Sequence, residues 1–350
     1  MLANRTFRFG ARSPFSKRHA CCVIADFEDM MNSILKKKLP QVPWLRLAAG
    51  SVLAAWIATT DGAGAASYGD ITFFVGSDSH YGGRSATQVC AQVSQATLSR
   101  MNALPGQEYP ATVGGGIVAA PRGVLLLGDL TEESPHSWQA FTNDWGLTGE
   151  RLLKFPVYEG YGNHDCLDPT VPEGIKARNR IRPGLSNISS NGYHYSWDWD
   201  FLHLVCLNLF PANEVDNQKP PHDPRHSLDF LVDDLARNVG RSGRPVIVCH
   251  HYGVDGNSNL WWSDQQRTNF FEALKNYNVV EILSGHTHNV LFTTWCGLDT
   301  CNDGTVGKFA GTFLVAHVTA TNLTLVTRLA DNNWGPTFTK AITNGVVSAP

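Results

Sequence analysis

Short apolar runs alternate with amphipathic stretches along the chain from Tyr68 onward. The runs are rich in Val, Ile, Leu and Phe, and each stops at Gly or at a polar cluster, which is typical of buried strands. Six strands are predicted in this way, at residues 71–78, 123–130, 155–165, 201–209, 245–251 and 279–288.

Helical patterns lie between these runs, at residues 85–101, 137–145, 227–238 and 263–277. The last one opens with Ser263 and Gln266 at the spacing of a capping box. Strands that alternate with helices predict βαβ units and a largely parallel sheet. The helical signal stops after His288, where a run of antiparallel strands is expected. With no internal repeat or linker, residues 67–350 are interpreted as one α/β domain.

The first 66 residues follow another pattern. Residues 31–66 contain a basic stretch at Lys36–Lys38, an apolar run at 47–58 and small residues ending at Ala65 or Ala66. These are the parts of a secretory signal peptide, and the apolar run is shorter than the roughly 20 residues that span a bilayer. Residues 1–30 are interpreted as a non-native or disordered N-terminal extension. The prediction is a secreted or periplasmic protein with no stable membrane insertion after signal cleavage.

Charge changes the picture of possible partners. Residues 1–65 hold nine Lys or Arg and four Asp or Glu, so the remaining chain has 19 basic and 27 acidic residues and a net charge of −8. A domain this acidic is a poor match for nucleic acid or an anionic membrane. An anionic substrate therefore needs local positive charge, such as metal ions. Cys296 and Cys301 bracket a short polar loop and are the best candidate for a local disulfide, whereas the other cysteine pairings stay open.

The candidate chemistry lies where the predicted strands end. Five strands end in Asp, Asn or His residues, and ligands of an open α/β sheet bind outside the carboxyl ends of its strands. Each motif alone also fits a turn or a helix cap, but five of them at equivalent positions predict a metal site. The side chains at these ends are Asp78, His80, Asp129, Asn163, His164, Asp165, His250, His251, His286 and His288.

These motifs resemble those of the calcineurin-like metallophosphoesterase superfamily, with its D-x-H, GD, GNH(D/E), strand-end His and GHxH elements. The resemblance spans residues 78–288 and implies a four-layer α/β/β/α sandwich with two facing mixed sheets. It also implies a binuclear metal centre. Asp78, His80 and His288 would hold one metal, Asn163, His250 and His286 the other, and Asp129 would bridge both. His250 is preferred to His251 because the family's ligand aligns with the first His, and adjacent strand residues point to opposite faces.

The residue types support this chemistry independently. Two divalent ions with a shared carboxylate clamp the attacking and leaving oxygens of an in-line displacement and supply hydroxide near neutral pH. His, Asn and carboxylate ligands suit Mn, Fe, Zn or Co. His164 is the candidate catalytic residue, which would stabilise the transferring phosphoryl group or protonate the leaving oxygen. Asp165 would orient it.

Two departures from known patterns narrow the subfamily. Purple acid phosphatases have D-x-G and GDxxY motifs, but here His80 is retained and Glu132 occupies the Tyr position. Ser/Thr protein phosphatases carry GDxVDRG and GNHE, whereas this chain has GDLTEES and GNHD. The resemblance therefore points to the general phosphomonoesterases and phosphodiesterases.

Three functions remain. The leading one is an exported phosphomonoesterase acting on a small-molecule phosphate ester with a two-metal-activated hydroxide. The second is a phosphodiesterase acting on a nucleotide, a glycerophosphodiester or a lipid head group. The third is a non-catalytic secreted metal-binding protein. Residues 168–191 and 255–264 are candidates for the wall that selects the substrate, and Trp261 and Trp262 either stack on a base or sugar or pack in the core.

Overall fold

The computed structural model describes residues 69–85, 88–132, 136–216, 222–254, 256, 260–309 and 311–343. All of them belong to one compact unit, Ala65–Pro350. The predicted N-terminal extension (1–30) and signal peptide (31–66) lie outside the described residues. Among the helices of the described part, none is long and apolar enough to cross a bilayer.

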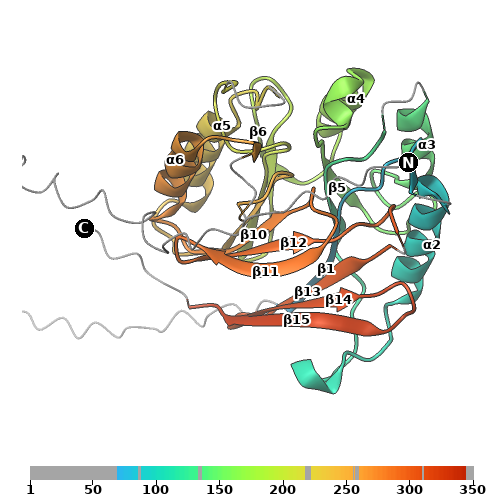
Figure 1. The fold of residues 1–350 in the computed structure, drawn as a ribbon. Helices are drawn as coiled ribbons and strands as arrows, with labels where there is room; N and C mark the ends of the chain where they lie inside the picture. Colours follow the sequence, from blue (N-terminus) through green and yellow to red (C-terminus); the bar gives the residue numbers. More distant parts are fainter. Residues whose placement is uncertain are drawn as a thin grey trace, which may run out of the picture. The chain divides into compact units, whose positions relative to one another are not determined.

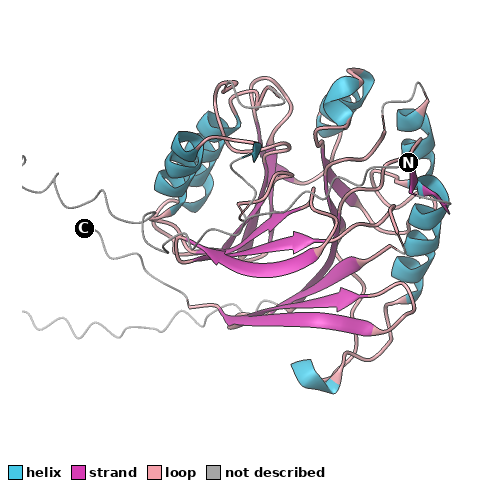
Figure 2. Cartoon of the chain, viewed as in Figure 1, coloured by secondary structure: helices cyan, strands magenta, loops and turns pink. Residues whose placement is uncertain are grey.

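Two mixed sheets form the centre of the unit (Figures 1 and 2). The six-stranded sheet has the order β15 (Trp334–Ala341), β14 (Asn322–Arg328), β13 (Phe313–Val318), β1 (Ile71–Gly76), β4 (Val124–Leu127) and β5 (Val157–Gly160). The seven-stranded sheet has the order β11 (Val290–Trp295), β12 (Leu298–Asp303), β10 (Val279–Ser284), β9 (Val246–Cys249), β8 (Leu202–Cys206), β7 (Tyr195–Trp199) and β6 (Leu185–Ile188). A small hairpin joins β2 (Arg84–Ser85) to β3 (Gln88–Val89).

Helices cover the outer faces of the two sheets. Figure 1 shows α2 (Cys90–Ala103), α3 (Ser137–Asp144) and α4 (Thr170–Asn179) beside one sheet, and α5 (Ser227–Asp234) and α6 (Asp264–Leu274) beside the other. Short helical turns occur at η1 (Ala111–Val113), η2 (Asp165–Leu167) and η3 (Leu235–Val239). The predicted capping box at Ser263 is present at the start of α6. This is the predicted four-layer α/β/β/α sandwich.

The apolar pattern explains why the sheets face each other. Ile71, Phe73 and Val75 of β1 point into a core shared with the second sheet, whereas Phe74 points into the core under the helices. Both faces of the strand are therefore buried, and even its polar residue, Thr72, is only 3% exposed. The six predicted strands form the parallel centres of the two sheets, β1-β4-β5 and β8-β9-β10, so their carboxyl ends meet at one edge.

The predicted Cys296–Cys301 disulfide is absent, since Cys301 is not disulfide-bonded. The β11–β12 register pairs Trp295 with Leu298 and Phe292 with Cys301. Cys296 therefore lies in the two-residue turn of a hairpin, while Cys301 is three strand positions further on and packs in the core between the sheets. In a hairpin of this register, residues that far apart along the strands do not come within disulfide distance.

Candidate metal centre

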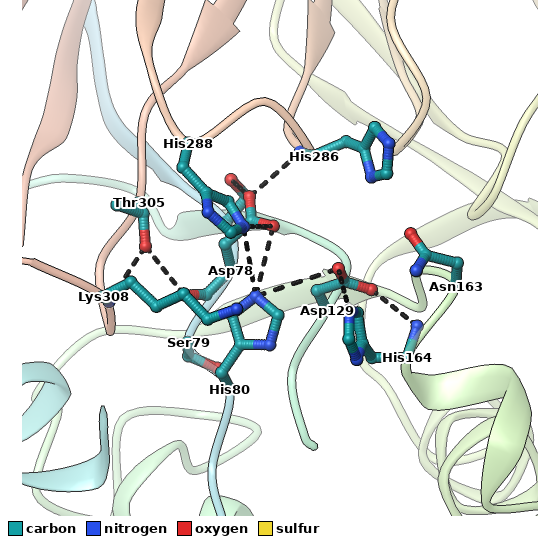
Figure 3. A network of polar contacts seen from close by, with 12 residues as sticks. Asp78, Ser79, His80, Asp129, Asn163, His164, His286, His288, Thr305 and Lys308 are labelled. Atoms are coloured by element: carbon teal, nitrogen blue, oxygen red, sulfur yellow. Dashed lines mark hydrogen bonds and ion pairs between the residues drawn. The ribbon is translucent and has the colours of Figure 1, made fainter. Parts of the chain in front are cut away.

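The strand ends bring three overlapping groups of potential metal ligands together. They are Asp78, His80 and His288, then His80, Asp129 and His164, and finally Asp129, His251 and His286; within each group the ligand atoms lie within 4.8 Å of one another. Asp129 belongs to two of the groups, as expected of a bridging carboxylate. Figure 3 labels these side chains, apart from His251, where their loops meet.

The backbone at this edge is unusually strained. Asp78, His80, Asp129, His286 and His288 all have positive φ angles, between 44° and 71°. Non-glycine residues rarely adopt this conformation, and such strain concentrates at functional sites. The strand ends therefore curl sharply and turn side chains from both sheets toward one point. Gly162 permits the same crowding, because a Cβ there would lie 2.2 Å from Asp129 Oδ1.

In the first group, two ring nitrogens and a carboxylate oxygen face one another. His80 Nδ1 lies 2.6 Å from Glu132 Oε2, and in the neutral ring it is the nitrogen that donates. Its Nε2 lone pair then points at His288 Nε2, 3.2 Å away, and at Asp78 Oδ1, 3.6 Å away. Electron pairs converging in this way repel each other unless a cation lies between them. The donor set therefore fits a metal ion.

The second group is built in the same way. His251 Nδ1 donates to the Leu127 carbonyl at 2.7 Å, which leaves the Nε2 lone pair of the neutral ring free to bind. That nitrogen lies 3.2 Å from Asn163 Oδ1 and 3.3 Å from Asp129 Oδ2. The His286 ring packs edge-on against the His251 ring, with centroids 5.1 Å apart. Imidazole, amide and carboxylate donors converge here, a set that suits divalent transition metals.

The pKa values show how strongly this cluster attracts positive charge. Burial lowers the pKa of His251, but Asp129 outweighs it and raises the value to about 9. Burial opposes ionisation of Asp129, yet the charge and hydrogen bond of His251 lower its pKa to about 2. Burial and the charge of His251 lower the pKa of His286 to about 3. Protons thus gather on the rings nearest the carboxylates, where metal ions would replace them.

His251 replaces His250 in this cluster, which corrects the predicted ligand set. Ile247 and Cys249 of β9 face the core between the sheets, and His251 continues that parity toward the site. His250 continues the parity of Val248 and points under the helices. Its ring packs against Trp262 and Phe270, with centroids 5.9 and 5.5 Å away, and burial lowers its pKa to about 3. The other six predicted ligands lie at the site.

His164 lies at the open side of the cluster. Its side chain is 28% exposed, and its Nε2 is 4.0 Å from Asp129 Oδ2. Its backbone N–H donates to Asp129 Oδ1 at 2.9 Å, which fixes the loop against the shared carboxylate. The nitrogen is therefore well placed to reach a group bound beside Asp129.

Asp165 does not orient His164, contrary to the prediction. Its buried carboxylate accepts hydrogen bonds from the backbone N–H groups of Leu130, Thr131 and Gly162 at 2.8–3.0 Å. It thereby ties the loop after β4 to the loop after β5. Burial and the charge of Asp129 raise the pKa of Asp165 to about 6.

Glu132 is the functional residue that the sequence prediction missed. Its carboxylate lies between two rings, 2.6 Å from His80 Nδ1 and 3.3 Å from His164 Nδ1. The contact with His164 and then that with His80 hold the pKa of Glu132 well below its usual range. The same contact raises the pKa of His164. Glu132 is therefore the carboxylate beside the His164 ring, the position that was expected for Asp165. Its spacing of three residues after Asp129 was the available signal.

Comparisons with known proteins agree with this geometry. The calcineurin-like phosphoesterase family profile matches residues 72–290. A dimetal phosphatase from Danio rerio superposes with a TM-score of 0.52 at 11% identity, covering 78% of this chain and 99% of that one. GAP50 of Plasmodium, described as the anchor in the inner membrane complex, superposes with a TM-score of 0.50 at 11% identity, covering 78% and 89%. A search of curated protein sequences gave no match. The extent of the family match shows that the chain belongs to the calcineurin-like phosphoesterases and is a phosphoester hydrolase.

Proposed function

We propose that this protein is an exported phosphomonoesterase that uses two divalent metal ions. Asp78, His80 and His288 would hold one ion, and Asn163, His251 and His286 would hold the other. Asp129 would be shared between them. The observation that carries the proposal is the convergence of two donor groups, Asp78 with His80 and His288, and Asp129 with His251 and His286. Asp129 Oδ2 also lies 3.9 Å from His80 Nε2, which places this carboxylate between the two groups.

The bound ions would supply positive charge for the phosphoryl oxygens and lower the pKa of a nearby water. The protein's own residues then complete the reaction. Asp129 spans both donor groups through Oδ2 and fixes the His164 backbone through Oδ1. Glu132 Oε1 lies 3.3 Å from His164 Nδ1 and raises the pKa of the His164 ring, which favours its protonated form.

The proposed chemistry is a direct displacement. The water oxygen bonds to phosphorus while the bond from phosphorus to the ester oxygen breaks. The departing oxygen takes a proton from His164 Nε2. A proton released by the attacking water restores the protonated ring, so the products are inorganic phosphate and an alcohol. His164 is the residue at the site with both an exposed ring and a carboxylate partner that favours its protonated form.

Charge supports a monoester rather than a diester. A monoester carries a dianionic phosphoryl group and needs more positive charge around it than a diester. Two divalent ions face only two anionic ligands, Asp78 and Asp129. The predicted signal peptide at 31–66 supports export, and N-terminal sequencing of the protein released by its host tests that part.

The reaction is tested by comparing hydrolysis of a monoester, p-nitrophenyl phosphate, with that of a diester, bis-p-nitrophenyl phosphate. The protein used begins at Ser67 and is first reconstituted with each candidate metal. We expect turnover of the monoester, and we expect Asp129→Ala and His164→Ala to abolish it. His317→Ala is the control and should leave turnover unchanged, because this histidine of β13 pairs with Asp70 away from the site. Metal analysis should find two ions in the wild type and in His164→Ala. A preference for the diester would establish the phosphodiesterase. Two bound metals without turnover of either ester would establish the non-catalytic metal-binding protein.

A further inference from the structure

The segment that joins β12 to β13 is fixed against the metal-binding edge. Thr305 Oγ1 donates to the Asp78 carbonyl at 2.9 Å, and Gly307 N–H donates to the same oxygen at 3.3 Å. Gly307 lies so close to the first strand end that a Cβ there would meet the Ser79 carbonyl at 2.0 Å. Figure 3 shows Thr305 and Lys308 beside Asp78 and His80. The segment therefore carries its side chains at fixed positions relative to the site.

Phe309 on this segment combines an exposed ring with a strained backbone. Its side chain is 60% exposed, and its φ angle is +53°. An exposed aromatic ring loses the benefit of burial, and a bulky residue with positive φ is strained by about 1 kcal/mol or more. Its ring centroid lies 6.2 Å from that of His288. Two costs at one residue beside a catalytic centre indicate that the ring has a function.

The other aromatic rings near the GHTH motif (Gly285–His288) have packing roles. Trp262 is fully buried. Trp261 stacks on Tyr252 with centroids 5.3 Å apart and meets the His286 ring edge-on at 4.3 Å. Among the aromatic side chains that the structure describes around this motif, Phe309 therefore offers the most open face.

We propose that Phe309 forms the subsite for the organic group of the substrate, and that the enzyme prefers phosphate esters with a planar aromatic group. This inference rests on the proposed hydrolase function and names its substrate class. Lys308 Nζ lies 4.0 Å from Glu132 Oε2, beside the metal-binding side chains, while the ring of the next residue, Phe309, is exposed. The segment thus places an aromatic face next to the site, where the group attached to the phosphate would lie.

A planar ring fits this place better than an alkyl chain does. An alkyl chain needs a continuous apolar groove, but the described residues around Phe309 include the polar side chains of His288, Lys308 and Thr305. A single aromatic face is enough for an offset or edge-to-face contact with another ring, which strengthens binding about two- to tenfold beyond the area buried.

Binding of two phosphonates, which are not hydrolysed, tests the subsite by calorimetry with the metal-loaded protein. We expect phenylphosphonate to bind about tenfold more tightly than methylphosphonate. Phe309→Ala should reduce that ratio to below about threefold, and Phe309→Tyr should keep it. Phe309→Leu keeps apolar area without a ring and should lose most of the preference. Ile117→Ala removes a side chain of similar exposure, 58%, elsewhere on the surface and should change nothing.

Four results would overturn the subsite. Two concern the wild type, namely equal affinities for the two phosphonates or binding of neither. The other two are an unchanged ratio in Phe309→Ala and a full ratio in Phe309→Leu, which would indicate a general apolar contact. Thermal unfolding checks that each variant is folded. The binding test does not depend on turnover, so the two proposals can fail separately. If the protein prefers phenylphosphonate but hydrolyses no ester, the proposed reaction is refuted and the subsite is supported.

Discussion

Two buried groups of histidines and carboxylates in this fold are satisfied in opposite ways. Away from the metal centre, His203 on β8 has a carboxylate on each ring nitrogen, Asp198 at 2.7 Å and Asp234 at 2.7 Å. Asp234 belongs to α5, so this group ties the helix to the second sheet. At the metal centre, His80 and His288 instead turn ring nitrogens toward each other at 3.2 Å.

The difference separates a structural histidine from a metal ligand. A histidine with a partner on each nitrogen has no lone pair left to give, so its role is to hold elements together. A histidine with one nitrogen anchored and the other aimed at a shared point has a lone pair ready for a cation. His250 shows that an unpartnered ring is not enough. Neither of its nitrogens has a hydrogen-bond partner among the described residues, yet its surroundings are aromatic.

The adjacent pair His250 and His251 gives the largest expected contrast. His251→Ala should lower kcat/KM for p-nitrophenyl phosphate by about 10³-fold, or about 4 kcal/mol. The substitution removes the imidazole from the group of metal-binding donors that His251 forms with Asp129 and Asn163. It should also reduce the metal content. His250→Leu should keep kcat/KM within about threefold, since that ring contacts Trp262 and Phe270. Equal losses in the two variants would contradict the assignment by strand parity.

Glu281 on β10 extends the comparison to an unpaired group outside the metal centre. It is 1% exposed, neither carboxylate oxygen has a hydrogen-bond partner among the described residues, and burial and then the charge of Asp299 raise its pKa to about 8. The folded state thus holds a proton that the unfolded chain releases near pH 4.5. Stability should therefore fall as the pH rises from about 5 to 8.5.

Glu281→Gln should remove this dependence and stabilise the protein at pH 8.5 by about 3 kcal/mol relative to the wild type. Urea unfolding at several pH values measures it. Glu272→Gln, on the exposed face of α6, is the control. If Glu281→Gln retains the wild-type slope between pH 5 and 8.5, another group is responsible.

The sequence was sufficient for the strands and for most of the site because both depend on one regularity. Apolar runs that end in polar motifs become parallel strands, and the carboxyl ends of parallel strands share an edge. The choice between His250 and His251 depends on which face each residue of β9 presents. Val246–Cys249 are all buried, so no polar residue marks a face and the parity cannot be read from the sequence.

Other errors came from contacts that the local sequence does not reveal. Asp165 follows His164 directly, but the backbone turns its carboxylate toward three N–H groups of neighbouring loops. Helix α4 was not predicted because it contains Pro172 and Gly174, both weak helix formers. The glycine is needed there for packing, since a Cβ would meet Trp138 at 2.4 Å. Such contacts depend on elements far apart in the sequence.

The structural histidine should affect stability and leave catalysis alone. His203→Gln keeps one hydrogen bond to a carboxylate and loses the charge, so we expect about 2 kcal/mol of destabilisation and a melting temperature roughly 5 °C lower. The two carboxylates outweigh burial and raise the pKa of His203. Its stabilising effect is therefore complete below pH 6.5 and is lost as the pH rises through the folded pKa. A change in kcat/KM beyond about twofold would show that the group is linked to the site.

Glu132 belongs to both kinds of group, because it satisfies one nitrogen of His80 and lies against His164. Glu132→Gln keeps an acceptor for His80 but removes the charge that favours protonated His164. We expect kcat to fall about tenfold with KM nearly unchanged. That loss is at the lower end of the roughly 10- to 100-fold range seen when a metal-binding histidine loses the carboxylate that accepts its hydrogen bond. The descending alkaline limb of the kcat profile should also move to lower pH, since His164 would lose its proton more easily. A purely structural role would lower stability without moving that limb, so its position decides whether Glu132 acts on the proton of His164.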